Sequence, residues 1–180
     1  MEVLEQIYDG TIVDRAVHLF RNPFDNLVGR FHLSQKRQGT SYSNDGDGLM
    51  QWCRAFDAHA RDDELRSGHI PQKFMDTPCH GEWFRYVHWH NRAHDVTKKY
   101  KIPVHVLHYE DYSRDYNRTV EKLFKFLELE TEYPCKDFVP GKSYFNFFDD
   151  AYRKQAMDMA RALSSPSVWK MLKVYFATEE

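Results

Sequence analysis

Membrane-spanning and leader segments are the first features that the sequence lacks. No apolar run approaches the ~20 residues that a transmembrane helix needs. The stretch Met1–Gly10 carries Glu2, Glu5 and Asp9, and such acidic residues are not typical of a signal peptide. We therefore expect a chain that has no membrane segment and is soluble as given.

Metal-binding and redox motifs are also missing. Cys53, Cys79 and Cys135 are widely spaced and form no C-x-x-C pair, which argues against a zinc knuckle. Three cysteines cannot all be paired, but one bridge plus a free thiol fits a lumenal protein. His90 and His94 have the i, i+4 spacing of a chelating pair, yet no third ligand lies nearby, so we expect no metal site.

An excess of one charge is absent as well. The 25 Lys and Arg nearly balance the 27 Asp and Glu, which gives a net charge of −2 and no reason to expect a nucleic-acid partner. With 180 residues, of which 42% are hydrophobic and 16% aromatic, the chain is long and apolar enough for one globular domain.

The hydrophobic pattern alternates short strands with amphipathic helices. Strands are predicted around Arg15–Phe20 and Pro103–Leu107, and each leads into a helix. The predicted helices cover residues 23–38, 49–65, 81–100, 114–128, 149–163 and a last stretch from 166. Such alternation predicts an α/β fold in which the two strands are parallel neighbours, with Arg21 and Tyr109 following the same edge of the sheet.

The stretch from Val17 to His32 reads as a strand, a sharp turn and a helix. Asn22 is a good N-cap, and Pro23 is tolerated in the first helical turn because its missing N–H has no partner there. A helix N-terminus binds anions, and Arg21 adds a planar fork of donors beside it. The same spacing fits a surface arginine that pairs with Asp25.

This segment, FRNPFDNLVGRFH, resembles the 3′-phosphate-binding segment of sulfotransferases that use 3′-phosphoadenylyl sulfate, strand-R-N-P-x-D-x-x-V-S-x-x-H. The matching residues are Arg21, Asn22, Pro23, Asp25, Val28 and His32. The family's serine, which helps to hold the 3′-phosphate, falls on Gly29. The resemblance implies that Arg21 and Asn22 contact the phosphate, with Gly29 at the serine position.

A second segment, VHVLHYEDYSRDYNRTVEKLFKFLEL, resembles the family's strand-Y-E-D segment and the helix after it. The matching residues are Tyr109, Glu110, Asp111, Asp115, Thr119, Val120, Lys122, Leu123, Phe126 and Leu127. Tyr116 replaces the family's common proline. In the family this tyrosine lies near the adenine, so Tyr109 is the candidate, although a strand-end tyrosine without that role fits the same pattern.

A third segment, FVPGKSYFNFF, loosely fits the late loop with which the family closes its 3′-phosphate site. Gly141 would permit close backbone approach, and Lys142 would add a positive charge. A Pro-Gly turn followed by a solvated lysine explains these residues equally well.

The family's 5′-phosphosulfate loop, P-K-(S/T)-G-(T/S)-(T/S), does not occur in the 180 residues. The resemblance therefore implies a single domain, 1–180, with a partial P-loop-like three-layer fold that is helix-rich around a parallel sheet and lacks its N-terminal strand-loop-helix. The donor implied is 3′-phosphoadenylyl sulfate, and the acceptor is a hydroxyl or an amine. The compartment implied is the cytoplasm or, for a longer anchored precursor, the Golgi lumen.

The catalytic residue is not evident, because the family's usual histidine precedes the arginine strand. His32 and His108 flank the matched motifs and are the candidates that remain. Two functions stay open: a sulfotransferase, of which this chain carries the 3′-phosphate and adenine side, or an inactive nucleotide-binding or interaction module descended from that family.

Overall fold

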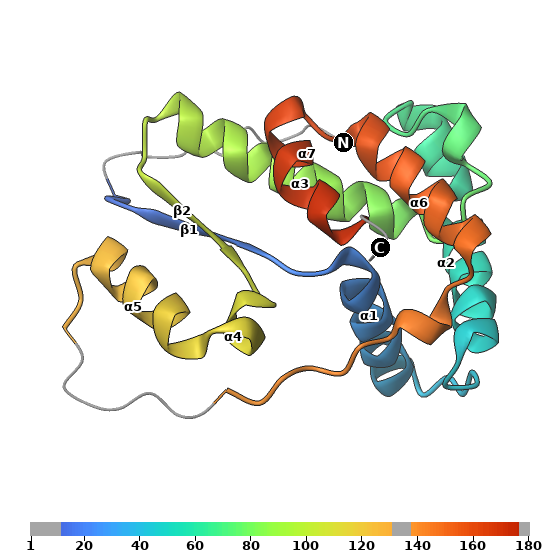
Figure 1. The fold of residues 1–180 in the computed structure, drawn as a ribbon. Coiled ribbons are helices and arrows are strands. Elements are labelled where there is room, and N and C mark those ends of the chain that lie inside the picture. Colours follow the sequence, from blue (N-terminus) through green and yellow to red (C-terminus); the bar gives the residue numbers. More distant parts are fainter. Residues whose placement is uncertain (1–11, 131–137, 177–180) are drawn as a thin grey trace. The chain divides into compact units, whose positions relative to one another are not determined.

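A computed structural model describes residues 12–130 and 138–176, and the chain divides into two compact units (Figure 1). The first unit comprises Met1–Phe20 and Arg92–Pro140, and the second comprises Arg21–Asn91 and Gly141–Glu180. The chain is rich in helix and contains a small parallel sheet of two strands, so the predicted helix-rich α/β class is confirmed.

The first unit contains the sheet, made of β1 (Ala16–Phe20) and β2 (Val104–His108). The strands are parallel, with Ala16 opposite Val104 and Phe20 opposite His108, as predicted. The pairing continues past the strand ends, because the Tyr109 N–H donates to the Phe20 carbonyl over 2.7 Å. Arg21 and Tyr109 therefore each follow the carboxyl end of one of two paired strands.

Two helices follow β2 in this unit, α4 (Asp111–Arg114) and α5 (Tyr116–Leu127). The sequence predicted one helix over 114–128, but the chain breaks at Asp115, whose backbone is outside the helical region at φ −155° and ψ 84°. Its carboxylate accepts from the Arg118 N–H at 3.1 Å and thereby caps α5. The Arg15 guanidinium donates to the Phe126 carbonyl and to Glu128, which ties the start of β1 to the end of α5.

The second unit is helical. Its elements are α1 (Pro23–Gln38), α2 (Gly46–Ser67), the 3₁₀ turn Gln72–Phe74, α3 (His80–Lys99, in this unit as far as Asn91), the 3₁₀ turn Phe145–Phe147, α6 (Asp150–Leu163), α7 (Pro166–Leu172) and the 3₁₀ turn Lys173–Tyr175. These bounds follow the predicted ranges closely. The start of α2 is earlier than predicted because the Asp45 carboxylate accepts from the Gly48 N–H at 2.9 Å and caps that end.

An aromatic core fills the second unit. Helix α1 buries Phe24, Leu27, Val28 and Phe31, the face that its 3.6-residue period predicts. Edge-on aromatic pairs join this face to other elements, for example Phe24 with Phe148 at a 5.0 Å ring separation. The resulting packing fixes α1 within its unit.

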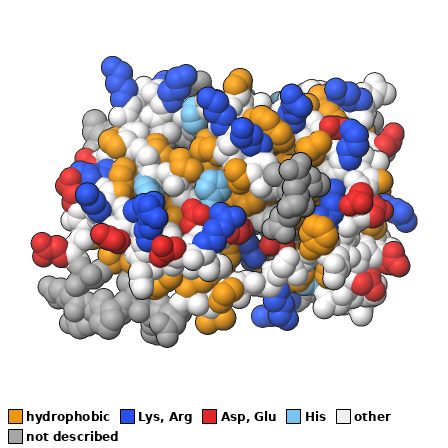
Figure 2. Space-filling model, in the orientation of Figure 1, with side chains coloured by type: hydrophobic (Ala, Val, Ile, Leu, Met, Phe, Trp, Pro, Cys, Tyr) orange, Lys and Arg blue, Asp and Glu red, His pale blue; other side chains and the backbone are white. Residues whose placement is uncertain are grey.

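The surface carries charges of both signs. On the face that Figure 2 shows, Lys and Arg side chains are interspersed with Asp and Glu, in line with the small net charge. Within the part of the chain that is described, no helix is both long and apolar enough to cross a bilayer.

Candidate nucleotide-binding site

The turn between β1 and α1 has the predicted capping geometry. The Asn22 side-chain oxygen accepts from the Phe24 N–H at 3.0 Å, and Pro23 occupies the first helical turn. The start of α1 thus combines an ordered N-cap with the positive end of a 16-residue helix. This local arrangement is the one that favours an anion.

Arg21 precedes this cap and lies close to residues of both α3 and α1. The Tyr86 hydroxyl on α3 donates to the Arg21 carbonyl over 2.6 Å, which fixes the backbone at this point. On α1, a Cβ placed on Gly29 would lie 3.9 Å from Arg21 Nη1, with no other heavy atom within 4 Å outside the helix's own backbone and the adjacent residues. A Cβ at this position, where the family has its serine, would therefore be in ordinary van der Waals contact with the guanidinium.

The late loop, defined as residues Gly141–Phe148, belongs to the same unit as α1. The Tyr144 N–H donates to Asp25 Oδ1 at 3.0 Å, although the two residues are 119 positions apart in sequence. The His32 ring packs edge-on against Tyr144, with centroids 5.4 Å apart, and against Phe147 at 6.3 Å. Lys142 and Gly141 lie two and three residues before this attachment. The loop that the sequence matched only loosely thus runs beside α1.

Tyr109 belongs to the first unit, where it forms part of an aromatic cluster with Tyr112, Tyr116 and Phe138. The Phe138 ring is the common partner: it meets Tyr109 edge-on at 5.4 Å and stacks on Tyr112 at 5.4 Å and on Tyr116 at 6.3 Å. All four side chains are partly exposed. Such rings offer flat apolar faces to a planar base. Tyr116, the departure from the family's proline, contributes to this cluster.

The two candidate bases have different surroundings. His32 Nε2 lies 2.6 Å from Asn44 Oδ1, so this imidazole is engaged by a hydrogen bond as well as by the two rings of the late loop. His108, at the end of β2, stacks on Phe20 with centroids 5.5 Å apart. Burial lowers the pKa of His108, an effect that nearby Asp111 and Glu110 oppose. A neutral imidazole is the form that can accept a proton.

A third histidine, His18 on β1, is packed inside the first unit. Its side chain is 5% exposed and stacks on Phe20 at 4.5 Å. Burial, followed by the charge of His94, lowers the pKa of His18 to about 4. His18 is therefore uncharged at neutral pH.

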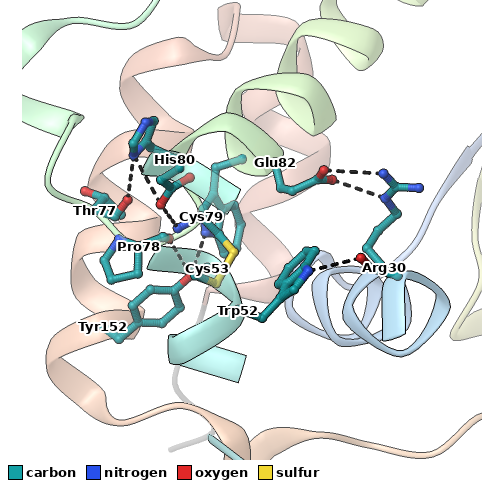
Figure 3. Close-up of a disulfide and its surroundings, with 12 residues drawn as sticks. Arg30, Trp52, Cys53, Thr77, Pro78, Cys79, His80, Glu82 and Tyr152 are labelled. Atoms are coloured by element: carbon teal, nitrogen blue, oxygen red, sulfur yellow. Dashed lines mark hydrogen bonds and ion pairs between the residues drawn. A yellow bond between two sulfur atoms is a disulfide. The ribbon is translucent and has the colours of Figure 1, made fainter. Parts of the chain in front are cut away.

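A disulfide that the sequence left open joins Cys53 on α2 to Cys79 just before α3 (Figure 3). The Asp57 carboxylate accepts from the Cys79 N–H at 2.7 Å and lies 3.4 Å from His80 Nδ1. Behind the bridge, the Trp83 indole N–H donates to the Tyr152 hydroxyl, which itself donates to the Pro78 carbonyl, both at 2.9 Å. Burial raises the pKa of Tyr152, so it remains a neutral donor.

A buried carboxylate on α3 holds α1 in place. Glu82 is 8% exposed, and its oxygens lie 3.3 and 3.4 Å from Arg30 Nε and Nη2 on α1. Arg85 provides a further contact at 2.9 Å. Sequence reasoning assigned no role to Glu82 or to Tyr86, since neither stands in a matched motif and both are ordinary members of a helical pattern. Together they attach α3 to α1 around Arg21.

Histidine pairs at chelating spacing do not form a metal centre in the residues that the structure describes. Within those residues, no three His, Cys, Asp or Glu side chains are grouped so that they could hold an ion. His90 is instead buried and packs edge-on against Tyr86 at 4.5 Å.

Comparison with known proteins gave one finding. A family model described as "Sulfotransferase domain" matches residues 14–162, which include all three segments discussed above. Neither curated proteins nor solved structures gave a match. Since the matched region covers most of the 180 residues, the chain belongs to the sulfotransferase-domain family.

Proposed function

We propose that this chain binds 3′-phosphoadenylyl sulfate and carries the 3′-phosphate and adenine side of a site that transfers a sulfuryl group to a hydroxyl or amine acceptor. Sulfuryl transfer in general follows from the family. The donor and the residues are the proposal. It assigns Arg21, Asn22 and the Gly29 position to the phosphate, Gly141 and Lys142 to its closure, and Tyr109 to the adenine.

The observation that carries this proposal is the arrangement around Gly29. A guanidinium, a capped helix N-terminus and a glycine whose added Cβ would touch that guanidinium come together in one stretch of nine residues. A phosphate needs a concentrated set of N–H donors and a positive charge, which this stretch supplies. Each donor to a charged group contributes about 1.5–3 kcal/mol.

The test compares two ligands and three proteins by calorimetry. Adenosine 3′,5′-bisphosphate and adenosine 5′-monophosphate differ by the 3′-phosphate. We expect the wild type and Arg37→Ala, an exposed arginine at the other end of α1, to prefer the bisphosphate. Arg21→Ala should lose that preference. An equal preference in all three proteins would contradict the assignment of Arg21.

Transfer also requires a loop that binds the sulfuryl group and a base that accepts the proton of the acceptor. We propose that the loop is contributed by a strand-loop-helix outside the 180 residues. Of the two base candidates we favour His108, because burial lowers its pKa and so favours the neutral form that can accept a proton.

The alternative, an inactive nucleotide-binding or interaction module, is favoured by one observation. No P-K-S-G-T-T-like stretch occurs in the sequence, and transfer requires a preorganised cradle for the group that moves. The two functions share the nucleotide site and differ in turnover.

We further propose an oxidising compartment, such as the Golgi lumen, over the cytoplasm. The support is the Cys53–Cys79 bridge, since reducing compartments keep most protein thiols reduced. Both sulfurs are fully buried within the second unit, which protects the bridge from exchange once it has formed.

A further inference from the structure

We infer that Asp25 is a positioning residue, which fixes the late loop on α1 so that Lys142 is held beside the phosphate position. This inference rests on the proposed function and assigns to one carboxylate the task of ordering that site. The matched motif has an aspartate at position 25. In the structure the Asp25 carboxylate accepts from the Tyr144 N–H at 3.0 Å.

Three residues of α1 that bear on the phosphate position share one face of the helix. Asp25, Gly29 and His32 are spaced at i, i+4 and i+7, so they lie on one side of α1. The late loop contacts the first through a hydrogen bond and the last through two aromatic rings. The two contacts lie on either side of Gly29, where an added Cβ would be 3.9 Å from Arg21 Nη1.

The late loop is also attached to elements other than α1. Arg153 on α6 donates to the Phe145 carbonyl and, at 3.2 Å, to the Phe148 carbonyl. A Cβ on Gly46, at the start of α2, would lie 2.7 Å from the Phe147 carbonyl oxygen. The loop is therefore attached on its far side at 145–148, and the Asp25 bond is its attachment nearest to Lys142.

Lys142 is close enough to Tyr144 to be affected by the bond between Tyr144 and Asp25. Lys142 is two residues from Tyr144, so its Cα is within about 7 Å of the Tyr144 Cα whatever the local conformation. Releasing Tyr144 from Asp25 frees the segment that contains Lys142, while the contacts at Phe145–Phe148 remain. Asp25 thus acts on the phosphate through the loop, without contacting the ligand itself.

The experiment is a double-mutant cycle on adenosine 3′,5′-bisphosphate affinity. We expect Asp25→Ala and Lys142→Ala each to weaken binding about tenfold, which corresponds to about 1.4 kcal/mol. If Asp25 acts through Lys142, the double variant should be little weaker than Lys142→Ala. Additive losses would overturn the inference.

Two further variants separate positioning from a general loss of structure. Asp25→Asn keeps an oxygen that can accept from the Tyr144 N–H, so it should retain most of the wild-type affinity. Asp47→Ala removes an exposed first-turn aspartate from α2 and serves as the matched control. An Asp25→Asn variant as weak as Asp25→Ala would overturn the inference, because it would indicate that the charge matters instead.

Hydrogen exchange of the free protein tests, without a ligand, whether Asp25 attaches the late loop to α1. The Tyr144 amide should be protected in the wild type and in Asp25→Asn, and should exchange at least tenfold faster in Asp25→Ala. Equal exchange in all three proteins would overturn the attachment. If the wild type binds no bisphosphate, the proposed function fails, whereas the exchange result still decides the role of Asp25 in the loop.

Discussion

Arg21 and Gly29 face each other across two turns of α1: the position for a Cβ on Gly29 is 3.9 Å from Arg21 Nη1. This separation is ordinary van der Waals contact, so a small side chain fits there without displacing the guanidinium. Gly29, where the chain departs from the family's serine, therefore lies next to Arg21, which matches the family's arginine.

Gly29→Ser should raise the affinity for adenosine 3′,5′-bisphosphate. The added hydroxyl supplies one donor to a charged group, worth about 1.5–3 kcal/mol, or roughly ten- to hundredfold in affinity. Gly29→Ala is the control, because it adds the Cβ and the gain in helix propensity without the hydroxyl. Calorimetry should rank serine above alanine and glycine; equal affinities for serine and alanine would contradict a phosphate at this position.

Tyr109→Ala should reduce the preference for adenine over a smaller base. Loss of one aromatic face costs about 1–3 kcal/mol of stacking, and Tyr109→Phe should keep most of it. The measurement compares adenosine and uridine 3′,5′-bisphosphates on the three proteins. If the alanine variant keeps the full adenine preference, Tyr109 is a strand-end residue without a role in binding.

The Cys53→Ser/Cys79→Ser double variant should lower the free energy of unfolding by about 2–4 kcal/mol, because the bridge closes a loop across 26 positions. Trp52 precedes Cys53 in sequence and is buried (Figure 3), so tryptophan fluorescence during denaturation reports on unfolding of this region. A reductant present during equilibrium denaturation should lower the free energy of unfolding of the wild type by a similar amount. It should leave the free energy of unfolding of the double variant unchanged. A non-reduced digest without a peptide that links 53 to 79 would contradict the pairing.

The stability of the sheet should fall as the pH drops from 6.5 towards 4. His18 has a folded-state pKa of about 4 against an ordinary value of 6.5, so in this window the unfolded chain binds a proton that the folded chain does not. The loss is on the order of 1–3 kcal/mol. His108, whose pKa is also lowered by burial, changes stability in the same direction.

Amide protection factors in β1 and β2, corrected for intrinsic exchange, measure this effect. His18→Phe should flatten the pH dependence and keep a ring against Phe20, whereas the exposed control His59→Gln should leave it unchanged. The same slope in wild type and His18→Phe would show that another group is responsible.

The 180-residue chain should show no sulfuryl transfer from labelled 3′-phosphoadenylyl sulfate, because neither a loop for the transferred group nor a base at the family's position is evident. A chain extended by a strand, a P-K-S-G-T-T-like loop and a helix should gain turnover. Turnover by the short chain would mean that its catalytic groups lie elsewhere, and His108→Asn would be the first variant to measure. No turnover by either chain would favour the inactive module.

The sequence by itself determined the features that depend on neighbouring residues. The Asn22 cap, the Pro23 start of α1 and its inner face follow from local hydrogen bonding and hydrophobic period, and the structure confirms them. The parallel strand pair is the one long-range feature that was predicted, because strands that alternate with helices favour a parallel sheet. The break at Asp115 was missed, since a capping aspartate inside a continuous helical pattern looks the same from sequence.

Only the tertiary structure decided the long-range pairings. The sequence could not single out Tyr144 as the partner of Asp25, Asn44 as that of His32, or Cys79 as that of Cys53. The last pairing was one choice among three cysteines. Such contacts depend on the path of the chain between the partners, which is set by the packing of all helices together and leaves no local pattern at either end.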